Sequence, residues 1–384
     1  VNYFDGPGME RDPFLTLRQL HEGPRIVYNL HNPLHGQSWL LTRAQDMRHV
    51  LDNPQLFSSD WQAGFSALVG ETWRLAGTEM DPPQHTRFRA LMNTWFSPGV
   101  IARLADRVRE RTVELIDAVL PQGGCDFVES FGTPFPNSIF MELFGLPAEH
   151  SEQFMQWELQ LLKNPDVGIK RQAALAILDY LRKLADDRRQ HPRDDFASLT
   201  VTANFDGKPL DYDDVMSLYW VLFTGGLDTV ASSLGFYFLH LATHPDYQQH
   251  LRDHPQDIPR AVDEYLRAYS PVTSQRRALQ DVEIAGVSIR RDDWITVIHA
   301  LGSLDPEQNP DPGTVSLDRR NAQHFAFARG IHFCVGSHLA RRELQIAIEE
   351  WLRRVPPFRI ADGAEAQTHG GIIFGVDRLP LVWA

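Results

Sequence analysis

The sequence is poor in cysteine, and its acidic side chains outnumber the basic ones. Only Cys125 and Cys334 occur among the 384 residues. Two thiols cannot build the disulfide framework of a secreted domain, so we expect a reducing, cytoplasmic location. The 37 basic and 50 acidic side chains give a formal net charge of −13. This charge disfavours proteins that bind nucleic acid or anionic lipid through non-specific electrostatics.

Long apolar runs are missing as well. The strongest run, from Tyr219 to Phe223, ends at Thr224-Gly225-Gly226. It is far shorter than the about 18 apolar residues that a membrane-spanning helix needs. The first residues also lack the basic region, the apolar region and the cleavage site of a signal peptide. We therefore expect a protein with no membrane segment.

Apolar residues recur mostly at helical spacing. This periodicity predicts amphipathic helices at residues 98–121, 171–188, 213–240, 257–269 and 337–354. Shorter apolar runs predict a strand pair at 25–30 and 38–42 and further short strands over 358–383. Thr42 and Gln45 have the spacing of a capping box, which predicts a helix from Thr42 to about Asn53. No repeat or linker divides the chain, so residues 1–384 are expected to form one mainly α domain with small β-sheets.

Cys334 lies between glycines just before a predicted helix. It belongs to the segment FARGIHFCVG, from Phe327 to Gly336. Backbone N–H groups and the dipole at a helix N-terminus stabilise a thiolate, which can be a nucleophile or a metal ligand. A single cysteine is by itself more often an inert core residue. The flanking residues must therefore decide between these interpretations.

This segment resembles the cysteine-ligand loop of the cytochrome P450 family at Phe327, Gly330, Cys334 and Gly336. The resemblance implies the cytochrome P450 fold, a single large helical domain that encloses haem b. It also implies that Cys334 is the iron ligand and that Phe327 and Gly330 border the haem. A thiolate donates electron density to the iron, and the glycines let the backbone approach the porphyrin closely. Ala328-Arg329 departs from the glycine that many bacterial members have there.

Further patterns fit the same resemblance, although an i, i+3 pair such as Glu264 and Arg267 is common by chance, and a solvated helix face would explain His85 and Arg89 in isolation. Glu264 and Arg267 stand three residues apart in a predicted helix and, with Arg319, resemble the structural ion pairs of the family. His85 and Arg89 have the i, i+4 spacing of a propionate-binding pair. The propionate partners that the resemblance implies, which would supply charge-assisted hydrogen bonds, are His85, Arg89, Arg276 and His332.

Gly225 and Gly226 lie within the helix predicted at 213–240 and are followed directly by Asp228 and Thr229. Each glycine costs a helix about 1 kcal/mol relative to alanine, which indicates a close approach or a local opening. A tightly packed helix crossing is the alternative explanation. The segment resembles the oxygen-activation motif of the family, in which the glycines leave room for dioxygen over the haem. The resemblance then makes Thr229 and Asp228 the residues that deliver protons for O–O cleavage.

Motifs from Met80-Asp81-Pro82-Pro83 to the end of the chain resemble the camphor-hydroxylase branch of the family. The branch implies a monomeric monooxygenase that uses O2 and receives electrons from a [2Fe–2S] ferredoxin, which an NADH-dependent reductase reduces. Arg89, Arg341 and Arg342 are expected to form a basic dock for the acidic ferredoxin near Cys334. A solvated helix face is the alternative for the two adjacent arginines.

The substrate is expected to be a small apolar terpenoid or norisoprenoid. Camphor hydroxylases have a tyrosine that binds the substrate ketone where this chain has Trp73, so camphor itself is expected to be a poor substrate. Ser274 stands where those enzymes have an aspartate beside a haem propionate. The positions at which the branch contacts substrate are, here, Trp73, Leu75, Thr78, Val221, Thr224, Val272, Ser274, Ile372 and Ile373.

Two other readings of the motifs remain beside the monooxygenase: a peroxide-driven peroxygenase and a non-catalytic haem-binding or gas-sensing protein. Peroxygenases usually lack the acid–threonine pair, and a sensor would need an output domain. His240 and His244 have the spacing of a zinc-binding pair, but Leu241 replaces the glutamate of a zinc peptidase, so we interpret them as packing residues. No Gly-x-Gly-x-x-Gly follows a predicted strand, so electrons must come from another protein.

Overall fold

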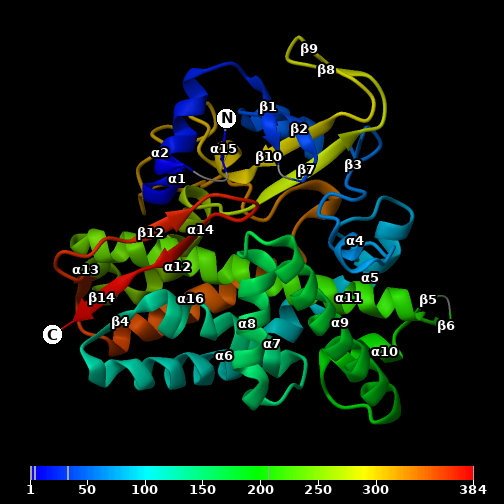
Figure 1. Cartoon of the computed structure of the whole chain (residues 1–384). Helices are drawn as coiled ribbons and strands as arrows, with labels where there is room; N and C mark the ends of the chain where they lie inside the picture. Colours follow the sequence, from blue (N-terminus) through cyan, green and yellow to red (C-terminus); the bar gives the residue numbers. More distant parts are fainter. Residues whose placement is uncertain (1, 4–5, 33, 206, 384) are drawn as a thin grey trace.

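The computed structural model describes residues 2–3, 6–32, 34–205 and 207–383. Helices dominate it, and the largest of them stack in the lower half of Figure 1 beneath a region rich in strands. The α-helices are α1 Pro7–Arg11, α2 Pro13–Arg18, α3 Ala44–Leu51, α4 Phe65–Val69, α5 Gln84–Trp95, α6 Pro98–Val119, α7 Pro134–Leu143, α8 Ser151–Leu162, α9 Val167–Gln190, α10 Phe196–Thr202, α11 Tyr212–Gly226, α12 Asp228–Thr243, α13 Pro245–Asp253, α14 Ile258–Ala268, α15 His299–Ser303 and α16 Ser337–Arg354.

The strands form small sheets. Their bounds are β1 Ile26–Asn32, β2 Gly36–Leu41, β3 Phe57–Ser58, β4 Gly124–Asp126, β5 Asn204–Phe205, β6 Lys208–Pro209, β7 Thr273–Ala278, β8 Val282–Ile284, β9 Val287–Ile289, β10 Trp294–Ile298, β11 Phe358–Ile360, β12 Gln367–His369, β13 Gly375–Arg378 and β14 Pro380–Trp383. The largest sheet is five-stranded with the order β1-β2-β10-β7-β3. Strand β10 pairs parallel with β2 and antiparallel with β7, so Ile295 lies opposite both Trp39 and Arg276.

Most of the helices predicted from apolar spacing are confirmed to within a few residues, as are the strand pair and the short strands near the C-terminus. The predicted helix at 213–240 is divided. It forms α11 and α12, which are separated at Leu227. The division follows directly after Gly225 and Gly226, whose low helix propensity permits the chain to leave the regular conformation.

The capping box predicted at Thr42 is wrong. The Thr42 hydroxyl donates instead to the carbonyl oxygens of Pro24 and Arg25, at 2.9 and 3.1 Å. The first N–H of α3, that of Ala44, donates to the Asp305 carboxylate at 2.7 Å. A side chain more than two hundred residues away in the sequence thus caps this helix, which local spacing could not predict.

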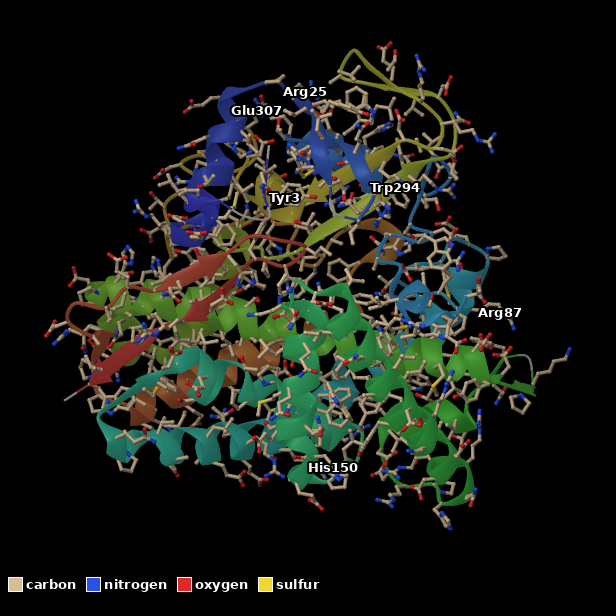
Figure 2. The ribbon with its side chains drawn as sticks, in the orientation of Figure 1. Tyr3, Arg25, Arg87, His150, Trp294 and Glu307 are labelled. Atoms are coloured by element: carbon tan, nitrogen blue, oxygen red, sulfur yellow. The ribbon has the colours of Figure 1, made fainter. Side chains whose placement is uncertain are left out.

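Two apolar cores fill the molecule. One joins the five-stranded sheet to α12, α14 and α16, and it includes the fully buried Trp351. The other joins α5, α8, α9, α10 and α11 around the fully buried Trp220. Leu227 belongs to the second core and Val230 to the first, so the break between α11 and α12 lies where the two cores meet. Figure 2 places Arg87 and His150 at the periphery and Tyr3 within the strand-rich part.

In the described part of the chain, every helix is too short or too polar to cross a lipid bilayer.

Candidate active site

Cys334 is held in a closed loop that precedes α16. Its backbone N–H donates to the carbonyl oxygen of Phe327 at 2.8 Å, and the N–H of Ala328 donates to the Phe325 carbonyl at 2.7 Å. A short 3-10 turn, Gly330–His332, fills the loop. These bonds close the loop on itself and fix the backbone at Cys334.

Cys334 lies in the wall of a cavity. Burial raises the pKa of the thiol, although the N–H of Gly336, which donates to the sulfur, and the charges of Arg89 and Arg341 act in the opposite direction. A backbone N–H that stabilises the thiolate is therefore present, as predicted, but it does not by itself offset the effect of burial on the pKa of the thiol. A thiolate here calls for a further positive charge on the cavity side, which an iron ion provides.

Two residues of the loop have left-handed backbone conformations. Gly330 has φ +64°, and a Cβ there would lie 2.5 Å from the carbonyl oxygen of Leu51. Glycine is thus needed because the loop packs on the end of α3. Ala328, at the departure from the family pattern, has φ +55°. An L-residue in this region is strained by roughly 1–2 kcal/mol.

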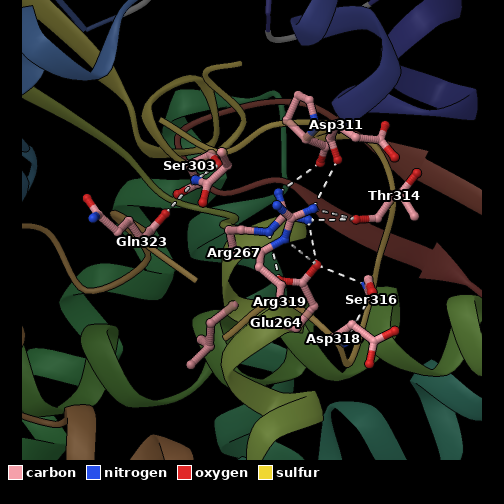
Figure 3. Close-up of polar contacts among 12 residues, drawn as sticks. Glu264, Arg267, Ser303, Asp311, Thr314, Ser316, Asp318, Arg319 and Gln323 are labelled. Carbon is pink, nitrogen blue, oxygen red and sulfur yellow. Dashed lines mark hydrogen bonds and ion pairs between the residues drawn. The ribbon is translucent and has the colours of Figure 1, made fainter. Parts of the chain in front are cut away.

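Glu264 joins two arginines behind the loop (Figure 3). Its carboxylate accepts two hydrogen bonds of 2.8 Å from Arg267 and one of 3.2 Å from Arg319. It also accepts from the backbone N–H of Ser316 at 3.0 Å. Arg267 and Glu264 are 0% and 1% exposed, and Arg267 donates to the carbonyls of Pro312 and Thr314 as well. The predicted residues are therefore brought together, and they tie α14 to the irregular segment before the cysteine loop.

The residues predicted to bind haem propionates lie near one another, and Arg89 and His332 line the cavity, whereas His85 and Arg276 do not. Arg276 is 2% exposed, and its two hydrogen-bond acceptors, Gln62 Oε1 at 3.1 Å and the Gln275 carbonyl at 2.7 Å, are neutral. Burial lowers its pKa to about 10. The His85 ring lies against the His332 ring at a centroid distance of 4.6 Å.

These residues fit a dicarboxylate group. His85 Nε2 is buried without a hydrogen-bond partner among the described residues. Burial and the nearby Arg276 lower the pKa of His332 to about 3. A buried arginine whose hydrogen-bond acceptors are both neutral, and an unpaired imidazole nitrogen, are costly unless an anion joins them. Propionate groups would supply that anion, so the residues present fit haem.

The cavity itself has a volume of about 350 Å³. Cys334 lies in its wall together with Gly225, Gly226 and Thr229 of the α11–α12 junction. For neither glycine does an atom from another part of the fold lie within 4 Å of the position that a Cβ would take, so they do not serve a helix crossing. They instead leave open space beside Thr229, which excludes the packing alternative. Of the predicted haem contacts, the cavity wall contains Arg89, His332, Phe327, Gly225, Gly226 and Cys334.

The nine predicted substrate positions are divided. The residues that line the cavity are Thr78, Val221 and Val272. Trp73 is buried behind the wall, where its ring lies 5.8 Å from that of Trp220. The positions that do not belong to the lining of this cavity are Trp73, Leu75, Thr224, Ser274, Ile372 and Ile373.

Some of these residues instead bind neighbouring groups. The Thr224 hydroxyl donates to the Trp220 carbonyl at 3.0 Å. Ser274 Oγ lies 3.0 Å from His299 Nε2. Ile372 is 37% exposed, and its carbonyl accepts from the N–H of Thr273. Ser274 thus stabilises a histidine where the related enzymes have an aspartate, and Ile372 stabilises strand β7.

Thr229 and Asp228 begin α12 on opposite sides of the wall. Thr229 lines the cavity, and its hydroxyl donates to the Gly225 carbonyl at 3.0 Å. Asp228 is 9% exposed and lies outside the cavity lining, and burial raises the pKa of its carboxyl group. The adjacent pair can therefore connect the cavity to a polar region behind the helix.

The sequence interpretation missed several groups. Gln62 and His299 line the cavity, but they come from segments without a motif. Burial raises the pKa of Glu343, another lining residue, to about 8. Glu343 could have been suspected, since it lies three residues after Ala340 and four before Ala347, on the otherwise apolar face of the helix after Cys334. The buried Glu158, on α8, carries no such signal in the sequence.

The arginines predicted to form a dock differ in their surroundings. Arg341 donates to Asp263 at 3.0 Å and lies over the Phe327 ring, 4.6 Å from its centroid. Arg89 lines the cavity and donates to Asn93. Arg342 is exposed. Of the three, Arg342 is thus the most accessible to another protein.

Comparisons with known proteins agree with this geometry. A probable cytochrome P450 127A1 of Sinorhizobium fredii is 37% identical over 99% of this chain and 93% of the relative. The monooxygenase PikC of Streptomyces venezuelae is 32% identical over 98% and 92%. The crystal structure of cytochrome P450 CYP101C1 covers 100% of this chain and 96% of its own, with 31% identity and a TM-score of 0.91. The cytochrome P450 family model matches residues 154–358, and the chain belongs to this family of haem-dependent monooxygenases.

Proposed function

We propose that this monooxygenase hydroxylates a small apolar terpenoid or norisoprenoid with electrons from a [2Fe–2S] ferredoxin. The observation that carries the proposal is the composition of the cavity wall. Around Thr229 it is mainly aliphatic and aromatic, with Val221, Leu222 and Val272 on the side of α11 and β7. Such a wall binds an apolar molecule through burial of surface and offers few polar groups to orient it.

Haem, when bound, supplies an iron centre that activates dioxygen and transfers one oxygen atom to the substrate. The residues of this chain hold it in place. Cys334 would bind the iron through its sulfur, and Arg276, Arg89 and His85 would hold the propionates. His332 would join them by exchanging a present partner, since its ring nitrogens lie 2.9 Å from Ser59 Oγ and 3.0 Å from the Gly77 carbonyl oxygen. The N–H of Gly336 donates to the sulfur and limits its basicity.

Proton delivery falls to the start of α12. Thr229 Oγ1 lies in the cavity wall and donates to the Gly225 carbonyl. By rotating away from that carbonyl, the hydroxyl can donate into the cavity and accept a proton from the direction of Asp228. Asp228 is buried behind it, so protons reach Thr229 without opening the cavity to solvent.

Camphor is expected to bind weakly. No tyrosine occurs among the residues that line the cavity in the described chain. A ketone would therefore lose the phenol hydrogen bond that camphor hydroxylases provide. The test is a ferric spin-shift screen of terpenoids, norisoprenoids and camphor. A high-spin shift with micromolar norisoprenoids, but not with camphor, supports the proposal, whereas tight binding of camphor alone contradicts it.

Macrolactones are the second candidate. Among the relatives, 6-deoxyerythronolide B hydroxylase of Saccharopolyspora erythraea is 33% identical over 90% of this chain. The same screen separates the two classes, because a macrolactone that shifts the spin state when small terpenoids do not would favour this alternative.

A peroxygenase would instead form product with hydrogen peroxide alone at the rate seen with the electron-transfer proteins.

The ferredoxin proposal rests on the positive side chains near Cys334. Arg342→Glu reverses the charge of the exposed arginine and is expected to raise the KM for ferredoxin several-fold, more so at low salt. Arg290→Glu is the control, since this exposed residue lies on the β8–β9 side of the molecule, away from α16 (Figure 1). Equal effects of the two variants would contradict a dock at Arg342.

A further inference from the structure

A glutamine in the cavity wall joins two parts of the site that lie far apart in the sequence. Gln62 lines the cavity and is 9% exposed. Its Nε2 atom donates to the carbonyl oxygen of Thr78 at 2.7 Å. Its Oε1 atom accepts from Arg276 Nη1 at 3.1 Å and from the backbone N–H of Gln275 at 3.3 Å. One amide group thus binds both a cavity-lining residue and an arginine that is predicted to hold a propionate.

The bond to Thr78 closes a loop that forms part of the cavity wall. Residues 63–78, here called the cavity loop, include α4, and the last three of them line the cavity. In the described part of the chain, no backbone hydrogen bond joins residues 62–64 to residues 75–79. Side chains close the loop instead, because Gln62 donates to Thr78 and the fully buried Glu79 accepts from the first two N–H groups of the loop, at 2.7 and 2.6 Å. The place of Thr78 in the wall therefore depends on Gln62.

Arg276 also depends on Gln62 for its direction. Among the described residues, both side-chain hydrogen bonds of this arginine are made by Nη1, one to Gln62 and one of 2.7 Å to the Gln275 carbonyl. Its Nε and Nη2 groups therefore keep their N–H donors for another acceptor. Without Gln62 the guanidinium would retain a single acceptor, on the adjacent peptide group, and its planar fork would no longer be fixed in one direction.

Gln62 is itself held on the five-stranded sheet. The two groups that donate to its Oε1 atom belong to β7, and its backbone carbonyl lies 3.3 Å from His35 Nε2. The His35 ring stacks on the ring of Trp294, at the start of β10, with a centroid distance of 3.5 Å. Figure 2 shows Trp294 in the strand-rich part of the molecule. The glutamine therefore connects a fixed part of the fold to a loop whose ends lack backbone bonds to each other.

We propose that Gln62 is a positioning residue that links the cavity loop to Arg276, so that an apolar molecule packed against Thr78 strengthens haem binding. Such a molecule keeps Thr78 in the wall, Thr78 keeps the Gln62 amide in place, and the amide directs the free N–H groups of Arg276 to a propionate. Linkage is reciprocal, so bound haem favours the loop position that binds the molecule. The inference rests on the proposed role of Arg276 in binding haem, and it applies to any apolar occupant of the cavity.

The first test measures the transfer of haem from the ferric protein to excess apomyoglobin. Gln62→Leu removes both side-chain bonds and is expected to speed the loss of haem about tenfold, as is typical when a residue that orients a ligand is removed. Arg276→Gln is expected to speed it at least as much. Both rates are read from the change in the haem absorbance, so they do not depend on substrate turnover.

Gln248→Leu is the matched control. Gln248 is 2% exposed, its Oε1 atom accepts from Arg252 and from a backbone N–H, and its Nε2 atom donates to two backbone carbonyls. It makes the same kinds of bond as Gln62 but does not line the cavity. Gln248→Leu should therefore lower the denaturation midpoint and leave haem loss close to the wild-type rate. Equal acceleration in both leucine variants would show a general loosening of the fold and would overturn the inference.

The second test measures the link itself, with imidazole and 4-phenylimidazole as probes. Both bind ferric iron through a nitrogen atom, and only the second has an apolar ring that can fill the cavity. In the wild type this ring is expected to slow haem loss about fivefold beyond the effect of imidazole. In Gln62→Leu the two probes should act alike. A wild type in which the probes act alike, or a Gln62→Leu protein that keeps the full difference, contradicts the inference.

Gln62→Glu tests the Thr78 side alone. Its carboxylate, which Arg276 keeps ionised, still accepts from the arginine but cannot donate to the Thr78 carbonyl, so the difference between the two probes should again disappear. His332, whose Nδ1 atom lies 3.0 Å from the Gly77 carbonyl oxygen, also contacts the cavity loop. It is unchanged in both variants and would preserve the difference if it were the link. Should Gln62→Leu fail to fold, Gln62→Glu decides, and a wild-type difference in it overturns the inference.

These outcomes separate the inference from the proposed function. If Arg276→Gln loses haem no faster than the wild type, the proposed haem-binding role of Arg276 is wrong, and the inference falls with it. If Arg276→Gln loses haem rapidly while the Gln62 variants behave like the wild type, the role of Arg276 stands and only the link is wrong. The identity of the natural substrate affects neither result, because both probes bind through the haem iron.

Discussion

The Thr229 hydroxyl donates a hydrogen bond to the carbonyl oxygen of Gly225 across the break between α11 and α12, with an O···O distance of 3.0 Å. Regular backbone bonding resumes with the N–H of Ala231, which donates to Leu227 at 3.2 Å. The side chain of Thr229 therefore bridges a gap in the helical ladder at the cavity wall. It holds the break open in one geometry and keeps its own oxygen facing the cavity.

Replacing Thr229 by alanine is expected to uncouple the reaction. Thr229→Ala removes the hydroxyl that can pass a proton into the cavity, so product per NADH should fall at least about tenfold, with hydrogen peroxide released instead. Thr229→Ser keeps the hydroxyl and should retain most of the coupling. Thr243→Ala is the control, because Thr243 makes the same kind of bond, to Leu239, at the far end of α12. Normal coupling in Thr229→Ala would remove Thr229 from proton delivery.

Cys334→Ala is expected to abolish the red-shifted Soret band of the reduced, carbon-monoxide-bound protein. The band depends on a thiolate ligand of the iron, which Cys334 in the cavity wall would supply. Cys125→Ala is the matched control. Cys125 lies in β4, where burial raises its pKa to about 12, and it is expected to leave the spectrum unchanged. A band that survives in Cys334→Ala would show that another residue holds the iron.

The residues predicted from local patterns are those whose role depends on near neighbours in the sequence. The spacing of Glu264 and Arg267 places both on one turn, and the fold confirms their bonds. The cysteine loop closes through residues only seven positions apart, Phe327 and Cys334. Helix periodicity was sufficient for α6 and α16 because each buries one continuous face.

Residues from distant segments could not be predicted in this way. Asp305, and not Thr42, accepts the hydrogen bond from the first N–H of α3, because the chain returns to this helix after more than two hundred residues. Whether Trp73 faces the cavity depends on how its ring packs against Trp220. Motifs identify the reacting groups, whereas the shape of the cavity and the proton path arise from tertiary contacts.

Ala328 offers a test of strain in the cysteine loop. Its φ of +55° is unfavourable for an L-residue, and glycine adopts this conformation without steric cost. Ala328→Gly is therefore expected to raise the free energy of unfolding by about 0.5–1 kcal/mol, after the greater flexibility of glycine in the unfolded chain is subtracted. The measurement is a urea titration of the haem-loaded protein. The control is Ala326→Gly, two residues earlier and outside the left-handed region, which should destabilise the protein. Stabilisation by both variants would contradict backbone strain at Ala328.

His240 makes the stability of the protein dependent on pH. Burial, and then the neighbouring His244, lower its pKa from 6.5 to about 3, and His240 Nδ1 lies 2.9 Å from the Tyr269 hydroxyl. Because the unfolded chain binds this proton more tightly, the folded state loses stability as the pH falls below 6.5.

His240→Gln keeps an acceptor for Tyr269 and removes the titration. Its unfolding free energy should therefore fall less between pH 6.5 and pH 4.5 than that of the wild type, by on the order of 2 kcal/mol. His254→Gln, at an exposed position, should follow the wild type in the same denaturant titrations. If His240→Gln also follows the wild type, His240 is not the source of the acid sensitivity.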